Sequence, residues 1–218
     1  MELNVLYEDN HIIVVEKPVG VPTQADYTND MDMYNLVRDY IKVKYNKPGL
    51  AFVGIVHRLD RPVGGVMVFA RTSKGASRLS EQVRNRTFKK IYLAKIEGHL
   101  EQKTGTLENY LVKNEKKNMS FVVDKDTVGA KEAKLDYEVI LEKEDTSIVK
   151  VTLHTGRHHQ IRLQFANINH PLVGDAKYGR DKKGRSNVML WAYSLEFKHP
   201  TKDEVMKFCL NPSWFNKK

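Results

Sequence analysis

The sequence predicts an α+β fold in which helices flank a large mixed, mainly antiparallel sheet. Segments with the composition of strands outnumber helical ones, and short turns join the later strands, which favours antiparallel pairing. No linker rich in Gly, Ser or Pro divides the chain, and it contains no internal repeat. Because 218 residues are enough to form one core, we expect a single domain over residues 1–218.

The first half of the chain is expected to mix strands and helices. An apolar run over residues 11–17 predicts a buried strand, which a Pro-Val-Gly turn ends. Apolar side chains at helical spacing predict a helix over residues 32–46. A strand rich in β-branched residues is expected over residues 64–71, and Ser73 is expected to be the N-cap of the next helix.

The second half is expected to consist mainly of strands. Alternating residues predict a strand over 90–97, and the lysine-rich stretch 101–131 is interpreted as a hairpin with a mobile loop around 113–118. The remaining elements are expected as strands over 134–143 and 147–154, a helix over 160–169, and strands over 188–197 and 204–210.

The charge of the chain favours a polyanionic partner. Lys and Arg number 36 against 27 Asp and Glu, which gives a formal net charge of +9. Nucleic acid suits such a surplus, because each neutralised phosphate releases condensed counterions. Residues 84–95 hold five basic side chains and no acidic one, with Phe88 and Tyr92 between them. Cations beside aromatic faces suit a nucleic-acid strand.

Composition excludes several classes of protein. Every apolar run is much shorter than the roughly 20 residues needed to span a bilayer. The N-terminus has acidic residues where a signal peptide has a basic and then an apolar region. The single cysteine, Cys209, excludes an intrachain disulfide and a multi-cysteine metal site. We therefore expect a cytoplasmic protein.

The first candidate site lies at the end of the apolar run 51–60, which brings His57, Arg58 and Asp60 together. If a strand continues that far, alternation places Arg58 and Asp60 on one face. One interpretation is an ordinary ion pair at a strand end. The other is a carboxylate in a basic cleft, where cations keep it ionised as a nucleophile or a base.

The second candidate site is the segment 154–162, with three histidines in six residues. Such a cluster suggests a metal, but Gly156 separates His154 from the other two, and no supporting Cys or Asp set is present. The better interpretation is a glycine turn that leads into a helix N-terminus. Backbone N–H groups, Arg157 and the histidines could hold a phosphate there.

The sequence does not contain the motifs of nucleotide cofactors or of serine hydrolases. No GxGxxG follows a strand, and Gly64-Gly65 lacks both a third glycine and the lysine of a phosphate-binding loop. No GxSxG is present either. The residues therefore offer an acid, a base and cations, and we expect no cofactor and no metal.

Five ordered motifs resemble those of the RluA-type RNA pseudouridine synthases. Residues 57–65 (HRLDRPVGG) are similar to the HRLDxxTSG signature of that family. The other four are EKPVG at 16–20, KIYLA at 90–94, GRHHQIR at 156–162, and HPLVGD followed by YG at 170–179. The resemblance extends from about residue 5 to about residue 197, nearly the whole chain. A lone HRLD would be weak evidence, whereas five motifs in order are specific.

The sequence departs from the family pattern at two positions. Val63 stands where the family usually has Thr or Ser, so a hydroxyl is lost near the predicted catalytic loop. Gln164 stands where a histidine is common, which alters an RNA contact or a structural one. We do not expect the N-terminal S4-type RNA-binding domain of some members, because the chain has no room for it.

The resemblance implies a pseudouridine synthase-like fold and a role for several residues. Asp60 would be the catalytic aspartate, and Arg162 would pair with it and keep it ionised. Tyr92 would stack on the target uracil and assist at C5. Arg58 would fill the gap that the flipped base leaves. We also expect RNA contacts from Lys89, Lys90 and Arg157.

The implied activity is that of an isomerase, which converts specific uridines in ribosomal or transfer RNA to pseudouridine without a cofactor. One alternative is a catalytically silent RNA-binding protein with the same fold. Another is a hydrolase or nuclease that uses Asp60 with histidines and a metal, for which the sequence offers no second carboxylate close to Asp60. We expect RNA as the partner and a monomeric protein.

Overall fold

The α+β class predicted from the sequence is confirmed. The computed structural model describes residues 2–26, 28–180 and 187–215, and these form three helices and eleven strands. They separate into two compact units: unit 1 is Met1–Lys89 with Ala192–Lys218, and unit 2 is Lys90–Trp191. The expectation of one domain over the whole chain stays a prediction. Among the described residues, no helix is both long and apolar enough to cross a membrane.

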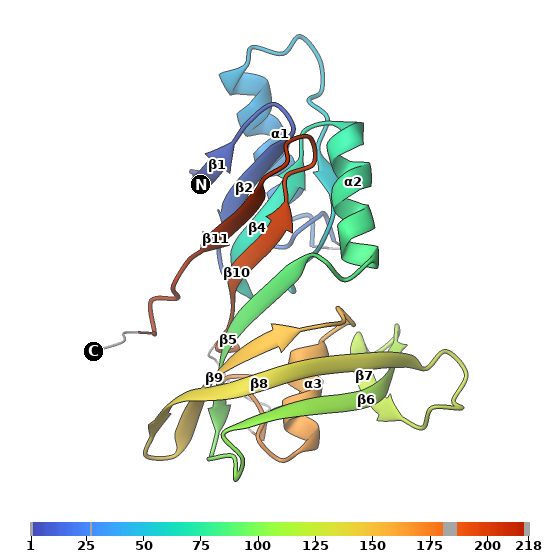
Figure 1. Cartoon of the computed structure of the whole chain (residues 1–218), viewed down its shortest axis with the longest axis vertical. Helices are drawn as coiled ribbons and strands as arrows, with labels where there is room; N and C mark the ends of the chain where they lie inside the picture. Colours follow the sequence, from blue (N-terminus) through green and yellow to red (C-terminus); the bar gives the residue numbers. More distant parts are fainter. Residues whose placement is uncertain (1, 27, 181–186, 216–218) are drawn as a thin grey trace. The chain divides into compact units, whose positions relative to one another are not determined.

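Unit 1 contains strands from both ends of the chain. Its strands are β1 (Val5–Glu8), β2 (Ile12–Lys17), β3 (Gly54–Ile55), β4 (Gly64–Ala70), β10 (Leu190–Lys198, from Ala192 onward) and β11 (Val205–Cys209). They follow the order β1-β2-β4-β10, with β3 paired to β4 and β11 paired to β10. Figure 1 shows the C-terminal strands, in red, beside the N-terminal ones, in blue and cyan.

The core of unit 1 lies around β2 and β4. Every residue of β4 is buried, as are five of the six residues of β2, so burial in these strands does not alternate. Gly65 is required for close packing, because its φ is +125° and a Cβ there would collide with the carbonyl oxygen of Ala192. Leu79 of the second helix packs into one cluster with Val66, Val68 and Phe197.

Two helices belong to unit 1, namely α1 (Met33–Lys44) and α2 (Ser73–Arg84). The predicted helices are confirmed, but the predicted cap of α2 is wrong by one residue. Thr72 has an extended backbone, and its hydroxyl accepts a hydrogen bond from the N–H of Gly75, so Thr72 is the N-cap and Ser73 is the first helical residue.

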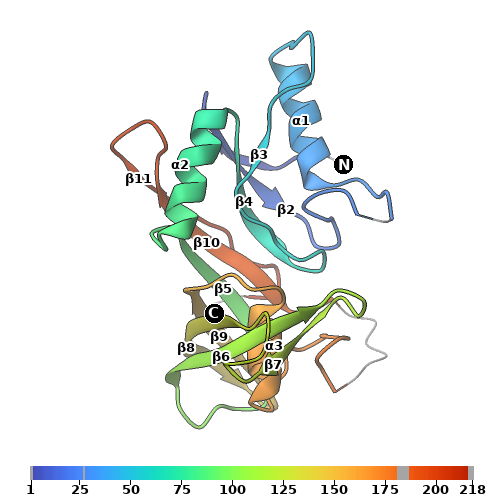
Figure 2. The ribbon, with the colours of Figure 1, turned by 90° about the vertical axis from the view of Figure 1, so that its right-hand side faces the viewer.

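Unit 2 consists of antiparallel strands and one helix. Its strands are β5 (Lys89–Glu97, from Lys90 onward), β6 (Thr104–Asn114), β7 (Met119–Val123), β8 (Lys131–Lys143) and β9 (Thr146–Leu153). Their order is β5-β9-β8-β6-β7, and each neighbouring pair is antiparallel. The helix α3 (Gln160–Asn167) lies against β6 and β7, as Figure 2 shows.

The strand predictions are confirmed except near two short elements. The turn between β6 and β7 falls inside the predicted loop around residues 113–118. β1 has four half-buried residues without alternation, so no pattern predicts it. The apolar run 51–60 contains only the two-residue strand β3, and residues 56–60 form a loop.

Candidate active site

Asp60 lies in the loop between β3 and β4, in unit 1. Because no strand continues to this position, the expected alternation of Arg58 and Asp60 does not apply: Arg58 is exposed and Asp60 is half-buried. The loop does not extend the strand because a side chain, not a neighbouring strand, satisfies the backbone of Leu59. The Thr23 hydroxyl donates to the carbonyl oxygen of Leu59 at 2.9 Å and accepts from its N–H at 3.2 Å.

Lys17 holds the other side of the same loop. Its side chain is completely buried at the end of β2, and its Nζ donates to the carbonyl oxygens of Pro18, Arg61 and Val63 at 2.9, 3.1 and 2.7 Å. Lys17 belongs to the EKPVG motif, from which no role for it is predicted. Its three acceptors are backbone oxygens, two of them more than 40 residues away in sequence, so no local pattern predicts them.

The Lys17 ammonium lies close to Asp60, and Arg61 follows Asp60 in the chain. Burial lowers the pKa of Lys17 to about 7, although the nearby Asp60 carboxylate opposes this shift and the Arg61 guanidinium adds to it. The guanidinium of Arg61 binds Asp26 at 2.9 Å and Asp30 at 2.7 Å. These two carboxylates belong to the segment that precedes α1. Arg61, the residue after Asp60, therefore connects the HRLD loop to that segment.

His57 makes structural contacts in unit 1. Its Nε2 accepts a hydrogen bond from the N–H of Val68 on β4 at 3.2 Å, and its ring lies 5.6 Å from the ring of Phe88. The first residue of the HRLD motif therefore connects the loop to β4 and to the core of unit 1.

Arg162 lies on α3 in unit 2 and forms a buried ion pair with Asp175. Its Nε and Nη2 donate to the two carboxylate oxygens, each at 2.7 Å, and the two side chains are 5% and 0% exposed. The Tyr178 ring lies 5.4 Å from the guanidinium carbon. Two parallel bonds fix the plane of the guanidinium. Asp175 is the last residue of the HPLVGD motif, and no role for it is predicted from the sequence.

Tyr92 lies on β5 in unit 2, opposite Val151 of β9, and is only 6% exposed. The predicted site residues are therefore divided between the units. Unit 1 contains Arg58, Asp60 and Lys89, and unit 2 contains Lys90, Tyr92, Arg157 and Arg162.

The three histidines of segment 154–159 bind three different sets of partners. His154 Nε2 lies 2.6 Å from Asp136, and the two ring nitrogens of His158 contact Ser120 and Asn118. His159 contacts the Tyr178 hydroxyl at 2.9 Å, and burial beside Arg162 lowers its pKa to about 2. Over the part of the chain that the structure describes, no group of three or more His, Cys, Asp or Glu side chains could hold a metal.

The predicted RNA-binding residues differ in their surroundings. Lys89 is 64% exposed and pairs with Glu196 at 2.6 Å. Lys90 is half-buried beside Gly156, and burial lowers its pKa. Arg157 donates from Nε to the carbonyl oxygen of Glu132 at 2.8 Å. A phosphate at Lys89 or Arg157 would therefore compete with, or add to, an existing contact.

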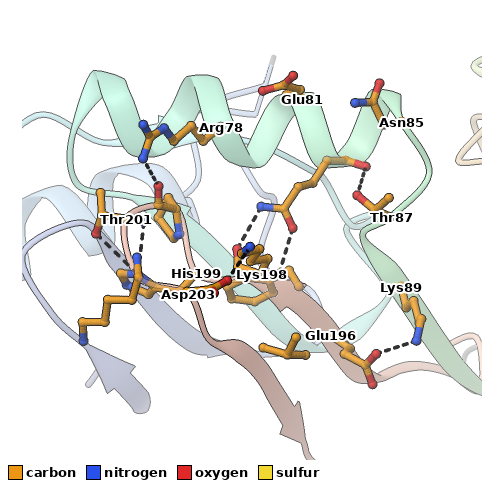
Figure 3. A pocket seen from close by; sticks show the side chains of 15 residues that line it. Arg78, Glu81, Asn85, Thr87, Lys89, Glu196, Lys198, His199, Thr201 and Asp203 are labelled. Carbon is orange, nitrogen blue, oxygen red and sulfur yellow. Dashed lines mark hydrogen bonds and ion pairs between the residues drawn. The ribbon is translucent and has the colours of Figure 1, made fainter.

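A groove of about 810 Å³ lies between α2 and the β10–β11 hairpin (Figure 3). Its polar groups hold the fold together: Arg78 donates to the carbonyl oxygen of Pro200 at 2.6 Å, and Gln82 exchanges two 2.8 Å hydrogen bonds with the backbone of Lys198. The catalytic residues predicted from the sequence are not among the described residues that line this groove. We therefore place the candidate site at the motif residues.

The two departures from the family pattern have structural counterparts. The Val63 side chain is buried, and the backbone of Val63 accepts from Lys17 and donates to the Asp60 carbonyl oxygen at 3.0 Å. Gln164 is fully buried, and its amide donates to three oxygens of β6 and β8, on Leu107, Asn109 and Ala133. The glutamine thus attaches α3 to the sheet of unit 2.

The fold is that of the pseudouridylate synthases. The human RNA pseudouridylate synthase domain containing 4 matches with a TM-score of 0.82 and 21% identity, over 97% of this chain and 90% of its own. The human RNA pseudouridylate synthase domain containing 1 matches with a TM-score of 0.77 and 24% identity, over 98% and 85%.

The chain belongs to the RNA pseudouridylate synthase family, whose model matches residues 11–167. Members of this family are isomerases. Two curated relatives are uncharacterized RNA pseudouridine synthases, from Aquifex aeolicus (37% identical) and Bacillus subtilis (33%), each aligned over 94% of this chain. The chain spans about two thirds of their length, 68% and 67%. The ribosomal large subunit pseudouridine synthase D of Borreliella burgdorferi is 29% identical, over 88% of this chain and 60% of its own.

Proposed function

We propose that this protein converts specific uridines of ribosomal or transfer RNA to pseudouridine, with Asp60 as the catalytic residue. The observation that carries the proposal is the HRLD loop, which holds the half-buried Asp60 between two backbone anchors. The Thr23 hydroxyl binds the backbone of Leu59 before it, and the Lys17 ammonium binds the carbonyl oxygens of Arg61 and Val63 after it. Names of relatives such as ribosomal large subunit pseudouridine synthases C and D favour ribosomal RNA. The cytoplasmic location and the monomeric state stay predictions of the sequence.

The proposed reaction breaks the N1–C1′ bond of uridine, turns the uracil and joins C5 to C1′. C5 then releases its proton, and N1, which kept the electron pair of the broken bond, takes up a proton. No atom or electron is gained or lost overall. The reaction therefore requires a carboxylate and a correctly oriented substrate. Asp60 either attacks C1′ or removes a sugar proton on a glycal route. Both routes need an ionised carboxylate, which nearby cations favour.

The other proposed roles rest on the family resemblance. Arg162 pairs with Asp60 and aims it, and Tyr92 stacks on the target uracil and assists at C5. The base must leave its stack, which costs roughly a few kcal/mol, and Arg58 fills the gap that it leaves. Lys89, Lys90 and Arg157 contact RNA. The alternative of a silent RNA-binding protein would be favoured if Asp60, Tyr92 or Arg162 were replaced, and all three are present.

The decisive experiment is Asp60→Asn, assayed by tritium release from C5-labelled uridine in RNA. The amide is nearly isosteric but is neither nucleophilic nor basic, so we expect release to fall to background while RNA affinity is retained. Asp203→Asn is the matched control, since that carboxylate is exposed and pairs only at the surface with Lys198. Release within about tenfold of wild type would remove Asp60 from the mechanism.

A map of pseudouridines in total RNA, from cells with and without this protein, identifies the substrate. Positions lost only in the absence of the protein would assign both the RNA and the uridine. An unchanged map together with retained RNA binding would favour the silent RNA-binding alternative.

A further inference from the structure

We propose that Thr23 is a positioning residue for Asp60, acting through the backbone of Leu59. The inference rests on the proposed function, because it assigns Thr23 a task in placing the catalytic carboxylate. Thr23 lies outside the five motifs, in the segment that connects β2 to α1. All the contacts that carry the inference lie within unit 1.

The Thr23 hydroxyl forms hydrogen bonds with both backbone groups of the residue before Asp60. It donates to the carbonyl oxygen of Leu59 at 2.9 Å and accepts from the N–H of Leu59 at 3.2 Å. The Leu59 carbonyl belongs to the peptide plane that also contains the nitrogen of Asp60. Fixing that oxygen therefore fixes the orientation in which the chain enters Asp60.

The hydroxyl is itself rigidly placed. Thr23 is only 4% exposed, and its own carbonyl oxygen accepts a hydrogen bond from the N–H of Tyr34 in the first turn of α1 at 3.1 Å. Pro22 precedes it with a fixed φ, and its carbonyl accepts from Met33 at 2.9 Å. β-branching restricts χ1 of Thr23 as well, so little freedom remains for the hydroxyl to leave Leu59.

Lys17 holds the loop on the other side of Asp60. Its ammonium binds the carbonyl oxygens of Arg61 and Val63, and the N–H of Gly20 also donates to the Arg61 oxygen at 2.9 Å. Asp60 thus lies between two anchors, one side chain before it and one after it. Of the two anchors, Thr23 can be changed with almost no change of volume or charge.

The test compares Thr23→Val, which removes the hydroxyl at constant shape, with Thr23→Ser, which retains it. The substrate is total RNA from cells that lack the protein and were grown on C5-tritiated uridine, and the rate is measured in single turnovers at saturating enzyme. Since small misplacements of a reacting group are costly, we expect Thr23→Val to lower the rate about 10- to 100-fold. RNA affinity should stay within about threefold of wild type, and Thr23→Ser should recover most of the rate.

Thr72→Val is the matched control, because the hydroxyl of the half-buried Thr72 also binds a backbone N–H, that of Gly75. It follows the far end of β4 from Asp60. We expect Thr72→Val to lower the melting temperature without lowering the rate of folded enzyme. In contrast, Thr23→Val should also speed hydrogen exchange of the Leu59 amide, a readout that does not depend on activity.

Three results would overturn the inference: a Thr23→Val rate within about twofold of wild type, no recovery in Thr23→Ser, or an equal loss of rate in Thr72→Val. If Asp60→Asn is inactive while Thr23→Val is normal, only the inference fails. If wild-type protein releases no tritium from any RNA, the proposed function fails and the inference falls with it.

Discussion

Tyr92 offers an aromatic ring and a hydroxyl, and substitution can separate the two. It is almost completely buried on β5, where a tyrosine could serve either the core or the proposed site. If the hydroxyl acts at C5, Tyr92→Phe should bind RNA normally and turn over slowly, whereas Tyr92→Ala should lose stacking as well. Single-turnover tritium release and filter binding measure the two effects. Equal rates for wild type and Tyr92→Phe would leave only the stacking role.

A second tyrosine of unit 2, the half-buried Tyr178, provides the control for that experiment. The hydroxyl of Tyr178 accepts from the N–H of Ser120 at 2.7 Å and contacts His159. Tyr178→Phe should therefore destabilise unit 2 through lost hydrogen bonds, by about 1–3 kcal/mol. A turnover defect confined to Tyr92→Phe would separate chemistry from stability.

Asp9 joins two hairpins that are far apart in the sequence. It follows β1 and binds His199, which lies between β10 and β11, with 2.7 Å between Oδ2 and Nε2. His199 Nδ1 accepts from the backbone N–H groups of Thr201 and Lys202, so its Nε2 carries the proton that is donated to Asp9. The pair fastens the β1–β2 turn to the β10–β11 hairpin.

The charge of Asp9 contributes to the stability of unit 1. Burial alone would raise the pKa of Asp9, but the N–H groups of His11 and Ile12 together with His199 lower it to about 2. A lowered carboxylate pKa stabilises the fold above the ordinary value of 3.8, and this contribution is lost as the pH falls toward about 2. Asp9→Asn should therefore lower the free energy of unfolding by roughly 2 kcal/mol near neutral pH, and by less in acid.

Urea unfolding at neutral pH and at about pH 3 measures that difference. Asp203→Asn is the comparison, since its ion pair with Lys198 is almost fully exposed and surface pairs contribute little. A gap between wild type and Asp9→Asn that stayed constant with pH would show that the carboxylate charge is not the cause.

Elements with a clear hydrophobic periodicity could be predicted from the sequence. Elements that depend on contacts with residues far away in the sequence could not. The apolar stripe Met33, Val37 and Ile41 predicts α1, because one helical face is buried. β1 has no such pattern. Thr72 and Ser73 are both good caps, and only the backbone conformation at Thr72 decides between them.

Across the whole chain, the sequence indicates candidate site residues but not the contacts that support them. Asp60 and Arg162 stand in contiguous motifs, so a reader of the sequence finds them. The contacts that support them are not visible in the motifs. Thr23 reaches Leu59 across 36 residues, and Asp175, although it belongs to a motif itself, reaches Arg162 across 13. Such contacts depend on where the fold returns the chain, which no local spacing encodes.

The net charge of +9 predicts that affinity for RNA falls as the salt concentration rises. If Lys89 and Lys90 both contact phosphate, replacing both with Gln should flatten the log–log salt dependence of affinity. Each phosphate contact contributes about 0.7–0.9 to that slope, so the change should reach roughly 1.4–1.8. Because Lys89 already pairs with Glu196, its contribution to the slope should be smaller than that of an unpaired lysine. The single variants Lys89→Gln and Lys90→Gln measure the two contributions separately.

The control removes the same charge elsewhere, by changing Lys103 and Lys143 to Gln. Lys103 is also an exposed lysine in an ion pair, with Glu142 at 2.6 Å, so it matches Lys89 in environment. Filter binding over a salt series, with target and non-target RNA, measures both slopes. Loss of affinity should be similar for the two RNAs, because phosphate contacts position a protein without reading bases. An unchanged slope in the Lys89/Lys90 variant would move the RNA-binding surface to Arg157, Lys177 and Arg180.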